Sequence, residues 1–141
     1  MMFNHFNKIS KKYFKYKNNK GYKNIYSEVS NQINPIIKNK NILDIGSGGN
    51  IFYNYNLAKK LYALDISENM LNNLNDNKIT KLIQDARDLS NIDKGSIDVV
   101  LMIFTIHHIN GPDYKSTLKS LQKILIEAEK VIGSEGEIII I

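Results

Sequence analysis

The segment that decides the fold is Asn41-Ile-Leu-Asp44-Ile-Gly46-Ser47-Gly48-Gly49-Asn50. Its first half is a short apolar run typical of a buried strand, and its second half is a turn rich in glycine. Because glycine has no side chain, a ligand can approach the backbone of such a turn closely. The segment therefore indicates a ligand site at the carboxyl end of a strand, although this signal is weak by itself.

A second acidic residue strengthens this interpretation. Asp65 follows Asp44 by twenty-one residues and lies at the end of another apolar run. A carboxylate at this position can accept hydrogen bonds from both hydroxyls of a ribose. Dinucleotide-binding proteins share these features, but their fingerprint requires a third glycine where this chain has Ile51. That glycine exposes a helix N-terminus to a pyrophosphate, so a ligand without a pyrophosphate does not need it.

Strand and helix patterns alternate on both sides of the glycine turn. One run, 97–104, is apolar except for Asp98 and is expected to be a central parallel strand covered on both faces. Because crossovers between parallel strands are right-handed, the alternation predicts a doubly wound parallel sheet. We expect its strands at 41–46, 61–66, 79–84, 97–104 and 137–141.

Three helices are predicted between or before these strands. Ile25, Val29 and Ile33 have helical spacing within 24–37, where Pro35 and Asn39 mark the exit. Ser67 is a candidate cap for a second helix, with Glu68 in its first turn and an apolar face of Met70, Leu71 and Leu74. Pro112 is predicted to open a third helix that ends at Gly133 and covers the sheet with Leu118, Leu121, Leu125, Ala128 and Ile132.

The composition is that of one globular domain. The chain has 141 residues, of which 43% are hydrophobic and 23% charged. It has no cysteine, which excludes disulfides, thiolate metal ligands and a cysteine nucleophile. The sequence shows neither a signal peptide nor an apolar run long enough to span a bilayer. We therefore expect a cytoplasmic protein that does not insert into membranes.

Positive charge is concentrated at the N-terminus. Residues 1–40 hold nine lysines and a single acid, Glu28, whereas residues 41–141 hold ten basic and thirteen acidic side chains. Lysines interleaved with Tyr13, Phe14 and Tyr16 could bind nucleic acid by phosphate contacts and base stacking. Arg87 is the only arginine, so forked contacts to bases are nearly absent. We favour a division into basic cap helices at 1–40 and a core at 41–141, without nucleic-acid binding.

Four motifs in order resemble those of class I S-adenosylmethionine-dependent methyltransferases, from residue 41 onward. The resemblance implies an α/β fold with a Rossmann-like, doubly wound, mostly parallel sheet of strand order 3-2-1-4-5, without the last two strands usual in the family. It also implies S-adenosyl-L-methionine as cofactor and methyl transfer to a small molecule. The motifs are Leu43-Asp44-Ile-Gly46-Ser-Gly48-Gly49, Leu64-Asp65-Ile-Ser-Glu-Asn-Met70-Leu71, Gln84-Asp85-Ala86-Arg87-Asp88-Leu89 and Ile97-Asp98-Val-Val-Leu-Met-Ile-Phe104-Thr-Ile-His107-His108-Ile.

The resemblance also implies roles for individual residues. Asp44 and the turn would hold the methionine part of the cofactor, and Asp65 would bind the ribose hydroxyls. Asp85 would accept a hydrogen bond from the adenine amino group. Phe104 and Thr105 would lie where the fourth strand opens onto the methyl-transfer centre. The complete set expected to bind the cofactor is Asp44, Gly46, Ser47, Gly48, Asp65, Ile66, Met70, Asp85, Ala86 and Phe104.

Structural roles remain open for several of these residues. Asp44 and Asp65 could cap turns at strand ends, and Asp85 and Asp88 could be loop acids. Met70 and Phe104, taken singly, are typical of core positions. The family turn often has a further glycine where this chain has Asn50, so the seat of the methionine tail is not fixed by the pattern.

His107 and His108 follow the fourth strand, where an acceptor would bind. Either imidazole could act as a general base because it titrates near neutral pH, although a histidine here could equally shape the pocket. Neighbouring side chains diverge and no other His or Cys cluster completes a site, so we expect no metal.

The last apolar run, 137–141, is predicted to form the edge of the sheet. We expect the chain to be truncated after its fifth strand, with self-association through this edge. An alternative to an active enzyme is a non-catalytic remnant or interaction module that binds the cofactor without transferring a methyl group.

Overall fold

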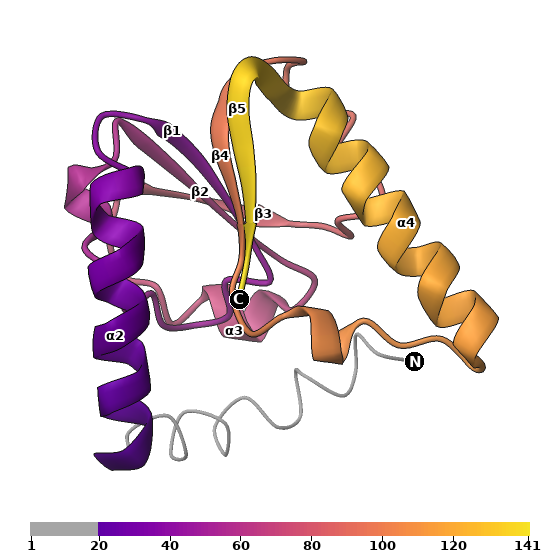
Figure 1. Cartoon of the computed structure of the whole chain (residues 1–141), viewed down its shortest axis with the longest axis horizontal. Coiled ribbons are helices and arrows are strands. Elements are labelled where there is room, and N and C mark those ends of the chain that lie inside the picture. Colours follow the sequence, from indigo (N-terminus) through magenta and orange to yellow (C-terminus); the bar gives the residue numbers. More distant parts are fainter. Residues whose placement is uncertain (1–19) are drawn as a thin grey trace.

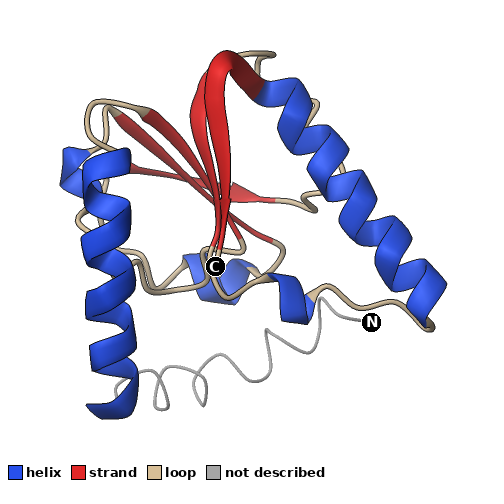
Figure 2. Ribbon diagram, in the orientation of Figure 1, coloured by secondary structure: helices blue, strands red, loops and turns tan. Residues whose placement is uncertain are grey.

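The computed structural model describes residues 20–141, in which a parallel sheet is flanked by helices (Figures 1 and 2). Two single-turn 3-10 helices, at Tyr55–Leu57 and Ile106–His108, lie in the connections. The main elements are α2 (Lys20–Ile36), β1 (Asn41–Ile45), β2 (Lys60–Asp65), α3 (Glu68–Leu71), β3 (Ile79–Ile83), β4 (Ile97–Met102), α4 (Tyr114–Val131) and β5 (Ile132–Ile140).

The five strands are all parallel and have the order β3-β2-β1-β4-β5, which confirms the predicted sheet. The chain moves outward from β1 through β2 to β3 and then returns to place β4 on the other side of β1. The order therefore reverses at β1, where Asp44 is in register with Ala63 of β2 and Leu101 of β4. In such sheets ligands bind beyond the carboxyl ends of the strands at the reversal point.

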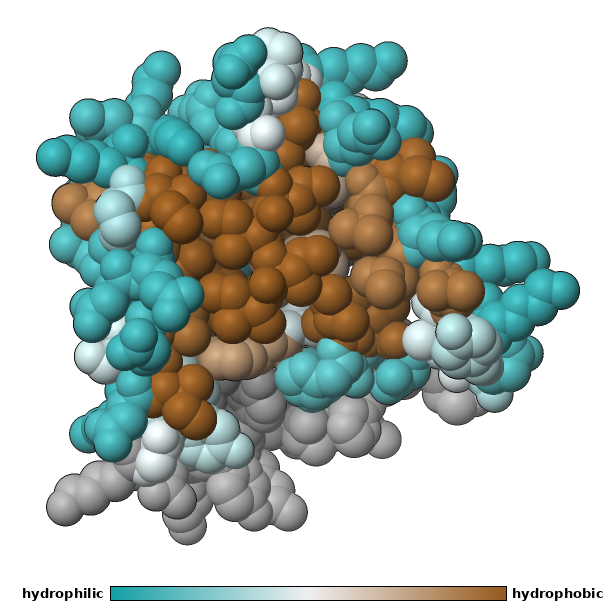
Figure 3. All heavy atoms as spheres, viewed as in Figure 1, coloured by the Kyte–Doolittle hydropathy of each residue, from teal (hydrophilic) through white to brown (hydrophobic). Residues whose placement is uncertain are grey.

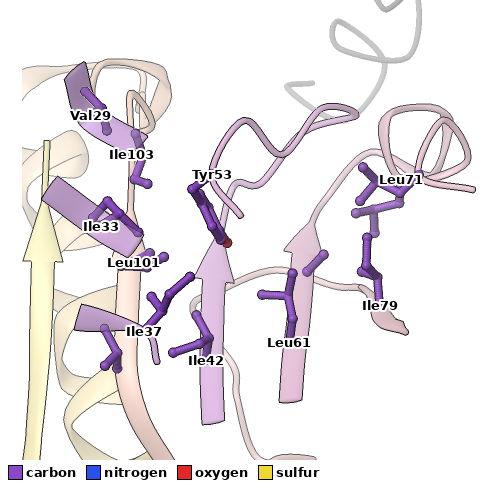
Figure 4. Packing of buried hydrophobic residues seen from close by; sticks show 13 residues of the cluster. Val29, Ile33, Ile37, Ile42, Tyr53, Leu61, Leu71, Ile79, Leu101 and Ile103 are labelled. Carbon is purple, nitrogen blue, oxygen red and sulfur yellow. The ribbon is translucent and has the colours of Figure 1, made fainter. Parts of the chain in front are cut away.

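Both faces of the central strands are covered. Figure 4 shows the face under α2, where Ile33 and Ile37 pack against Ile42 and Leu101. The face toward α4 contains Leu43, Ile45 and Val100 together with Ile124, Ala128 and Val131 of that helix. β4 is buried along its length except for Asp98, whose carboxylate accepts a hydrogen bond from the Asn41 backbone at 2.7 Å. This confirms β4 as a central strand.

The first described helix differs slightly from its prediction. α2 begins at Lys20 and includes Pro35 in its last turn, so this proline does not end the helix before Ile36. Val29 and Ile33 are buried as expected, but Ile25 is about half exposed. Ile25 lies near the N-terminal end of the helix, away from the sheet, as Figure 1 shows for that end of α2.

The second helix is correctly capped but shorter than expected. The Ser67 hydroxyl accepts a hydrogen bond from the Met70 backbone at 3.3 Å, as the sequence predicted. The helix ends at Leu71, and Leu74 is buried from the turn that follows.

The third helix has different ends and a different buried face from those predicted. Its cap is Asp113, which accepts a hydrogen bond from the Ser116 backbone, so the helix does not open at Pro112. Gly133 does not stop it, because Ile132 already belongs to β5. Leu118 is exposed, while Glu127 is buried and bonded to the Leu89 backbone at 3.1 Å. The buried residues of α4 are Ile124, Glu127, Ala128 and Val131.

β5 is longer than predicted and is one edge of the sheet. It begins at Ile132 rather than Glu137, and its register with β4 shifts between the pairs Ile97–Ile132 and Val99–Glu137. Glu135 and Gly136 therefore lie within this strand, in the part where its pairing with β4 is irregular. Ile138 and Ile140 are exposed, and Figure 3 shows apolar surface over this strand between α2 and α4.

The basic segment 1–19 lies outside the described residues, and so does the part of the predicted cap helices that falls within it. Within residues 20–141, no helix combines the length and apolar character needed to cross a bilayer.

Candidate functional site

One cavity opens at the carboxyl ends of the strands, at the reversal point of the sheet. Its wall comes from the turn after β1, the ends of β2 and β3, and the segment after β4. The structure places there all ten residues expected to bind a cofactor: Asp44, Gly46, Ser47, Gly48, Asp65, Ile66, Met70, Asp85, Ala86 and Phe104.

Asp44 is almost fully buried at the end of β1, with 4% of its surface exposed. Its Oδ2 accepts a hydrogen bond from the Tyr53 hydroxyl at 2.7 Å. Burial, followed by the charge of Asp44 and this bond, raises the pKa of Tyr53 well above its usual value. Tyr53 therefore remains protonated and acts as a fixed donor that orients the Asp44 carboxylate.

The glycine turn requires glycine at Gly46 for two reasons. The backbone of Gly46 has φ +71°, a left-handed conformation that other residues adopt at a cost. A Cβ atom there would lie 2.4 Å from Cγ2 of Thr105. The Thr105 hydroxyl lies 3.1 Å from the Ile45 carbonyl oxygen and donates to the backbone around the turn. Thr105 thus fastens the turn after β1 to the segment after β4.

Asp65 links the end of β2 to the same turn. Its Oδ2 accepts from the Gly48 backbone at 3.0 Å and its Oδ1 from the Ser67 backbone at 2.8 Å. These two bonds, one on each oxygen, hold the carboxylate in a defined orientation on the cavity wall.

Asp85, after β3, forms an ion pair with Arg87 two residues later. The Arg87 Nε lies 2.9 Å from Asp85 Oδ1, and Nη2 contacts Oδ2. These bonds lower the pKa of Asp85, although partial burial opposes the shift. Asp85 is therefore ionised, and Arg87 lies with it on the cavity wall.

The hydroxyl oxygen of Ser47 is buried without a hydrogen-bond partner among the described residues. Its side chain is buried on the cavity wall, with 8% of the residue exposed. Among residues 20–141, its Oγ has no hydrogen-bond partner. Because a buried hydroxyl without a partner is costly, this atom points to a polar ligand group in the cavity.

The two histidines occupy different positions. His108 is on the cavity wall, whereas His107 is not among the described residues that line it. Their ring centroids are 3.9 Å apart. Within residues 20–141, no three His, Cys, Asp or Glu side chains gather as they would around a metal ion.

Sequence reasoning missed several residues of the site. Tyr53 lies in an irregular crossover whose path no periodicity reveals, and its hydroxyl is the partner of Asp44. Arg87 belongs to one of the four motifs, but its pairing with Asp85 was not predicted, although their two-residue separation allows it. Phe52, also on the wall, gives no signal beyond being an aromatic residue near the turn.

The cavity, the sequence and the fold together indicate the family of this chain. The lining of the cavity fits a nucleoside cofactor. Its carboxylates can accept hydrogen bonds from hydroxyl and amino groups, and the backbone of the glycine turn and the buried Ser47 hydroxyl lie on the same wall. A family model described as a methyltransferase domain matches residues 43–140. No curated protein matches the chain.

Solved structures share the fold. A Thermotoga maritima structure, described as an S-adenosylmethionine-dependent methyltransferase and possible histamine N-methyltransferase, superposes with a TM-score of 0.75 at 19% identity, over 99% of this chain and 61% of that one. The N-methyltransferase NodS of Bradyrhizobium japonicum, in complex with S-adenosyl-L-homocysteine, gives 0.71 at 12% identity, over 87% and 62%. An S-adenosylmethionine-dependent methyltransferase of Aquifex aeolicus gives 0.62 at 20% identity, over 80% and 61%.

The chain thus spans about three fifths of the length of each of these three structures. The family model, in contrast, covers most of this chain. It includes the turn after β1, the acids Asp44, Asp65 and Asp85, and the segment after β4. The chain belongs to the methyltransferase-domain family, a group of Rossmann-like proteins of class I whose cofactor is S-adenosyl-L-methionine.

Proposed function

We propose that this chain binds S-adenosyl-L-methionine in the cavity and transfers its methyl group to a small-molecule acceptor. The observation that supports this proposal best is the convergence of Asp44, Asp65 and Asp85 on one cavity at the reversal point of the sheet. Asp44 and Asp65 lie at the ends of β1 and β2, Asp85 follows β3, and the Gly48 N–H of the glycine turn donates a hydrogen bond to Asp65.

Each part of the wall suits one part of the cofactor. Asp44 and the buried Ser47 hydroxyl would receive the methionine ammonium and carboxylate groups, beside the backbone of Gly46. Asp65 would bind the ribose hydroxyls. Asp85 would accept from the adenine amino group, while Ile66, Met70 and Ala86 would contact the adenine ring.

When bound, the cofactor would supply an electrophilic methyl group on its sulfonium: the acceptor atom would bond to the methyl carbon as the carbon–sulfur bond breaks, and S-adenosyl-L-homocysteine would leave. The chain contributes by orientation and by exclusion of water, since such a displacement needs no covalent enzyme intermediate. Asp44, held by Tyr53, and the turn, held by Thr105, fix the donor side.

A proton must leave an acceptor hydroxyl or amine during transfer. His108 lies on the cavity wall, after β4, and its imidazole is the candidate base. His107, for which the sequence predicts the same role, is the weaker candidate because the described cavity wall does not include it. A comparison of the pH profiles of His108→Gln and His107→Gln with that of the parent chain distinguishes the two.

Equilibrium dialysis with labelled cofactor tests the binding step. Asp65→Ala should weaken binding by at least about tenfold, because it removes charge-assisted hydrogen bonds to the ribose. Asp93→Ala is the matched control, because Asp93 is an exposed acid outside the cavity. Absence of binding by the parent chain, or equal loss in both variants, would contradict the proposal.

A non-catalytic remnant is the alternative to an active enzyme. The chain covers 61% of the Thermotoga maritima structure, so its activity is part of the proposal rather than a consequence of the fold. Two of the matched structures are described as N-methyltransferases, one of them as a possible one, so amines belong in the acceptor screen. Cofactor binding without turnover on any acceptor pool would favour the remnant.

Self-association through β5 is a second proposal, which the exposed edge favours. Ile138, Ile140 and Ile141 are exposed at this edge, and edge strands present unpaired backbone groups to a further strand. Sedimentation velocity should show a concentration-dependent dimer that Ile140→Lys reduces. A monodisperse monomer at all concentrations would refute this proposal.

A further inference from the structure

Three aromatic side chains from distant parts of the sequence form a continuous group beside the cavity. Tyr26 of α2 stacks on Phe52 at a centroid distance of 4.5 Å, and Phe52 lies 6.2 Å from Phe104 at an interplanar angle of 30°. Tyr26 is 6.1 Å from Phe104. We name Tyr26, Phe52 and Phe104 the aromatic wall. Phe52 and Phe104 line the cavity, and Tyr26 supports them from α2.

The aromatic wall lies away from the adenosine side of the cavity. Asp65 ends β2 and Asp85 follows β3, both on one side of β1. Phe104 follows β4, on the opposite side of β1. If the ribose binds Asp65 and the methionine part lies along the glycine turn, as proposed above, the β4 side of the cavity would be left for the acceptor. The aromatic wall is thus on the acceptor side.

The backbone fixes this wall in place. Phe104 has φ +52°, which is uncommon for a residue with a bulky side chain and is kept only where the surroundings impose it. Its backbone N–H donates to the Ile141 carbonyl at 2.7 Å. Phe52 is held between Tyr26 and the edge of Tyr53, whose ring is nearly perpendicular to it at 82°. The rings are therefore a preformed surface.

A preformed surface of ring faces and edges selects flat, unsaturated ligands. Aromatic pairs prefer offset-stacked or edge-to-face geometry and bind more strongly than their contact area alone would give. Among the described residues that line the cavity, the only Lys or Arg is Arg87, which is paired with Asp85, so that part of the wall offers no free cation to an anionic ligand.

We propose that the aromatic wall sets acceptor specificity, and that the acceptor is a small aromatic molecule without negative charge. This inference rests on the proposed function, since it concerns the acceptor half of the same cavity. It assigns specificity to Phe52 and Phe104 and a supporting role to Tyr26.

The test measures binding of three matched probes to the chain saturated with S-adenosyl-L-homocysteine, by titration calorimetry. The probes are 2-phenylethylamine, its saturated analogue 2-cyclohexylethylamine, and the anion 3-phenylpropionate. We expect the phenyl amine to bind about threefold to tenfold more tightly than the cyclohexyl amine, the range that ring contacts account for. The anion should bind most weakly.

Variants connect this preference to the wall. Phe52→Leu should abolish the preference for the phenyl ring, whereas Phe52→Tyr, which keeps the ring, should retain it. Tyr22→Leu is the control, because Tyr22 contacts Tyr26 in the same aromatic row at 5.9 Å but does not line the cavity. Circular dichroism and urea unfolding verify that each variant is folded.

The outcomes separate this inference from the proposed function. If S-adenosyl-L-homocysteine fails to bind the parent chain, the proposed function fails first. If it binds but no probe does, or the cyclohexyl amine binds as tightly as the phenyl amine, the aromatic wall does not set specificity. Retention of the full phenyl preference in Phe52→Leu would likewise overturn the inference.

Discussion

Replacing Gly46 with alanine tests whether the cavity depends on close contact between the turn after β1 and the segment after β4. The new Cβ would lie 2.4 Å from Cγ2 and 2.7 Å from Oγ1 of Thr105, so Thr105 must move. The left-handed backbone costs an alanine about 1–2 kcal/mol, and overpacking adds about 1–3 kcal/mol. The less flexible unfolded chain returns about 0.4–1 kcal/mol. We expect a net loss of about 1–5 kcal/mol of unfolding free energy.

A double-mutant cycle separates the two causes. Thr105→Ala removes both atoms in the close contact, so it should relieve the steric part in Gly46→Ala and leave the backbone part. Urea unfolding followed by circular dichroism should show a coupling of about 1–3 kcal/mol between the two substitutions. Effects that add within about 0.5 kcal/mol would refute the steric argument.

Gly21→Ala supplies the matched control. Gly21 lies in α2, and no heavy atom of the described chain is within 4 Å of the position that a Cβ would take there. Alanine should leave stability unchanged or raise it by up to about 1 kcal/mol. A loss of stability as large as that of Gly46→Ala would show that the loss at Gly46 does not come from its close contact with Thr105.

Three further predictions concern stability. Tyr53→Phe should lower the free energy of unfolding by about 1–3 kcal/mol, because buried Asp44 loses a donor; an unchanged urea midpoint would contradict this. Ser67→Ala should cost about 0.5–2 kcal/mol by removing the cap of α3, and an unaltered transition in scanning calorimetry would count against that role. The Lys130 ammonium, the Leu89 N–H and the Lys123 ammonium lower the pKa of Glu127 from 4.5 to about 2. Because the folded state has the lower pKa, this stabilisation is complete above pH 4.5 and is lost as the pH falls toward 2. In Glu127→Gln the decline in stability between these pH values should be smaller than in the parent chain, as urea titrations at several pH values would reveal.

Much of the fold could be predicted because its signals are local. The apolar runs, the glycine turn and the Ser67 cap each depend on residues adjacent in sequence, and the handedness of crossovers then indicates a doubly wound sheet. The strand order, which the structure confirms, was implied by the resemblance to class I methyltransferases. The cavity residues were implied by the resemblance to class I methyltransferases, and they lie near the carboxyl ends of parallel strands, which meet at one edge. The structure brings all ten together, while their contact with a cofactor stays a prediction.

The parts that sequence did not reveal depend on packing between distant segments. Periodicity in α4 is compatible with several neighbouring faces. In the structure the buried face packs Ile124, Ala128 and Val131 on the sheet and includes Glu127, which accepts a hydrogen bond from the Leu89 backbone. β5 begins earlier than expected because its irregular register absorbs Gly133 and Gly136, which resemble a turn. Tyr53 finds Asp44 through a crossover without periodicity.

The hydrogen bond from the Phe104 N–H to the Ile141 carbonyl connects the residue after β5 to the aromatic wall, which an acceptor would contact. Fraying at the end of β5 would break this bond and free the backbone of Phe104. The Phe104 ring would then be less fixed, and the preference among acceptors would weaken. The rate of hydrogen exchange at the Phe104 amide therefore measures how often this hydrogen bond opens and releases the Phe104 backbone.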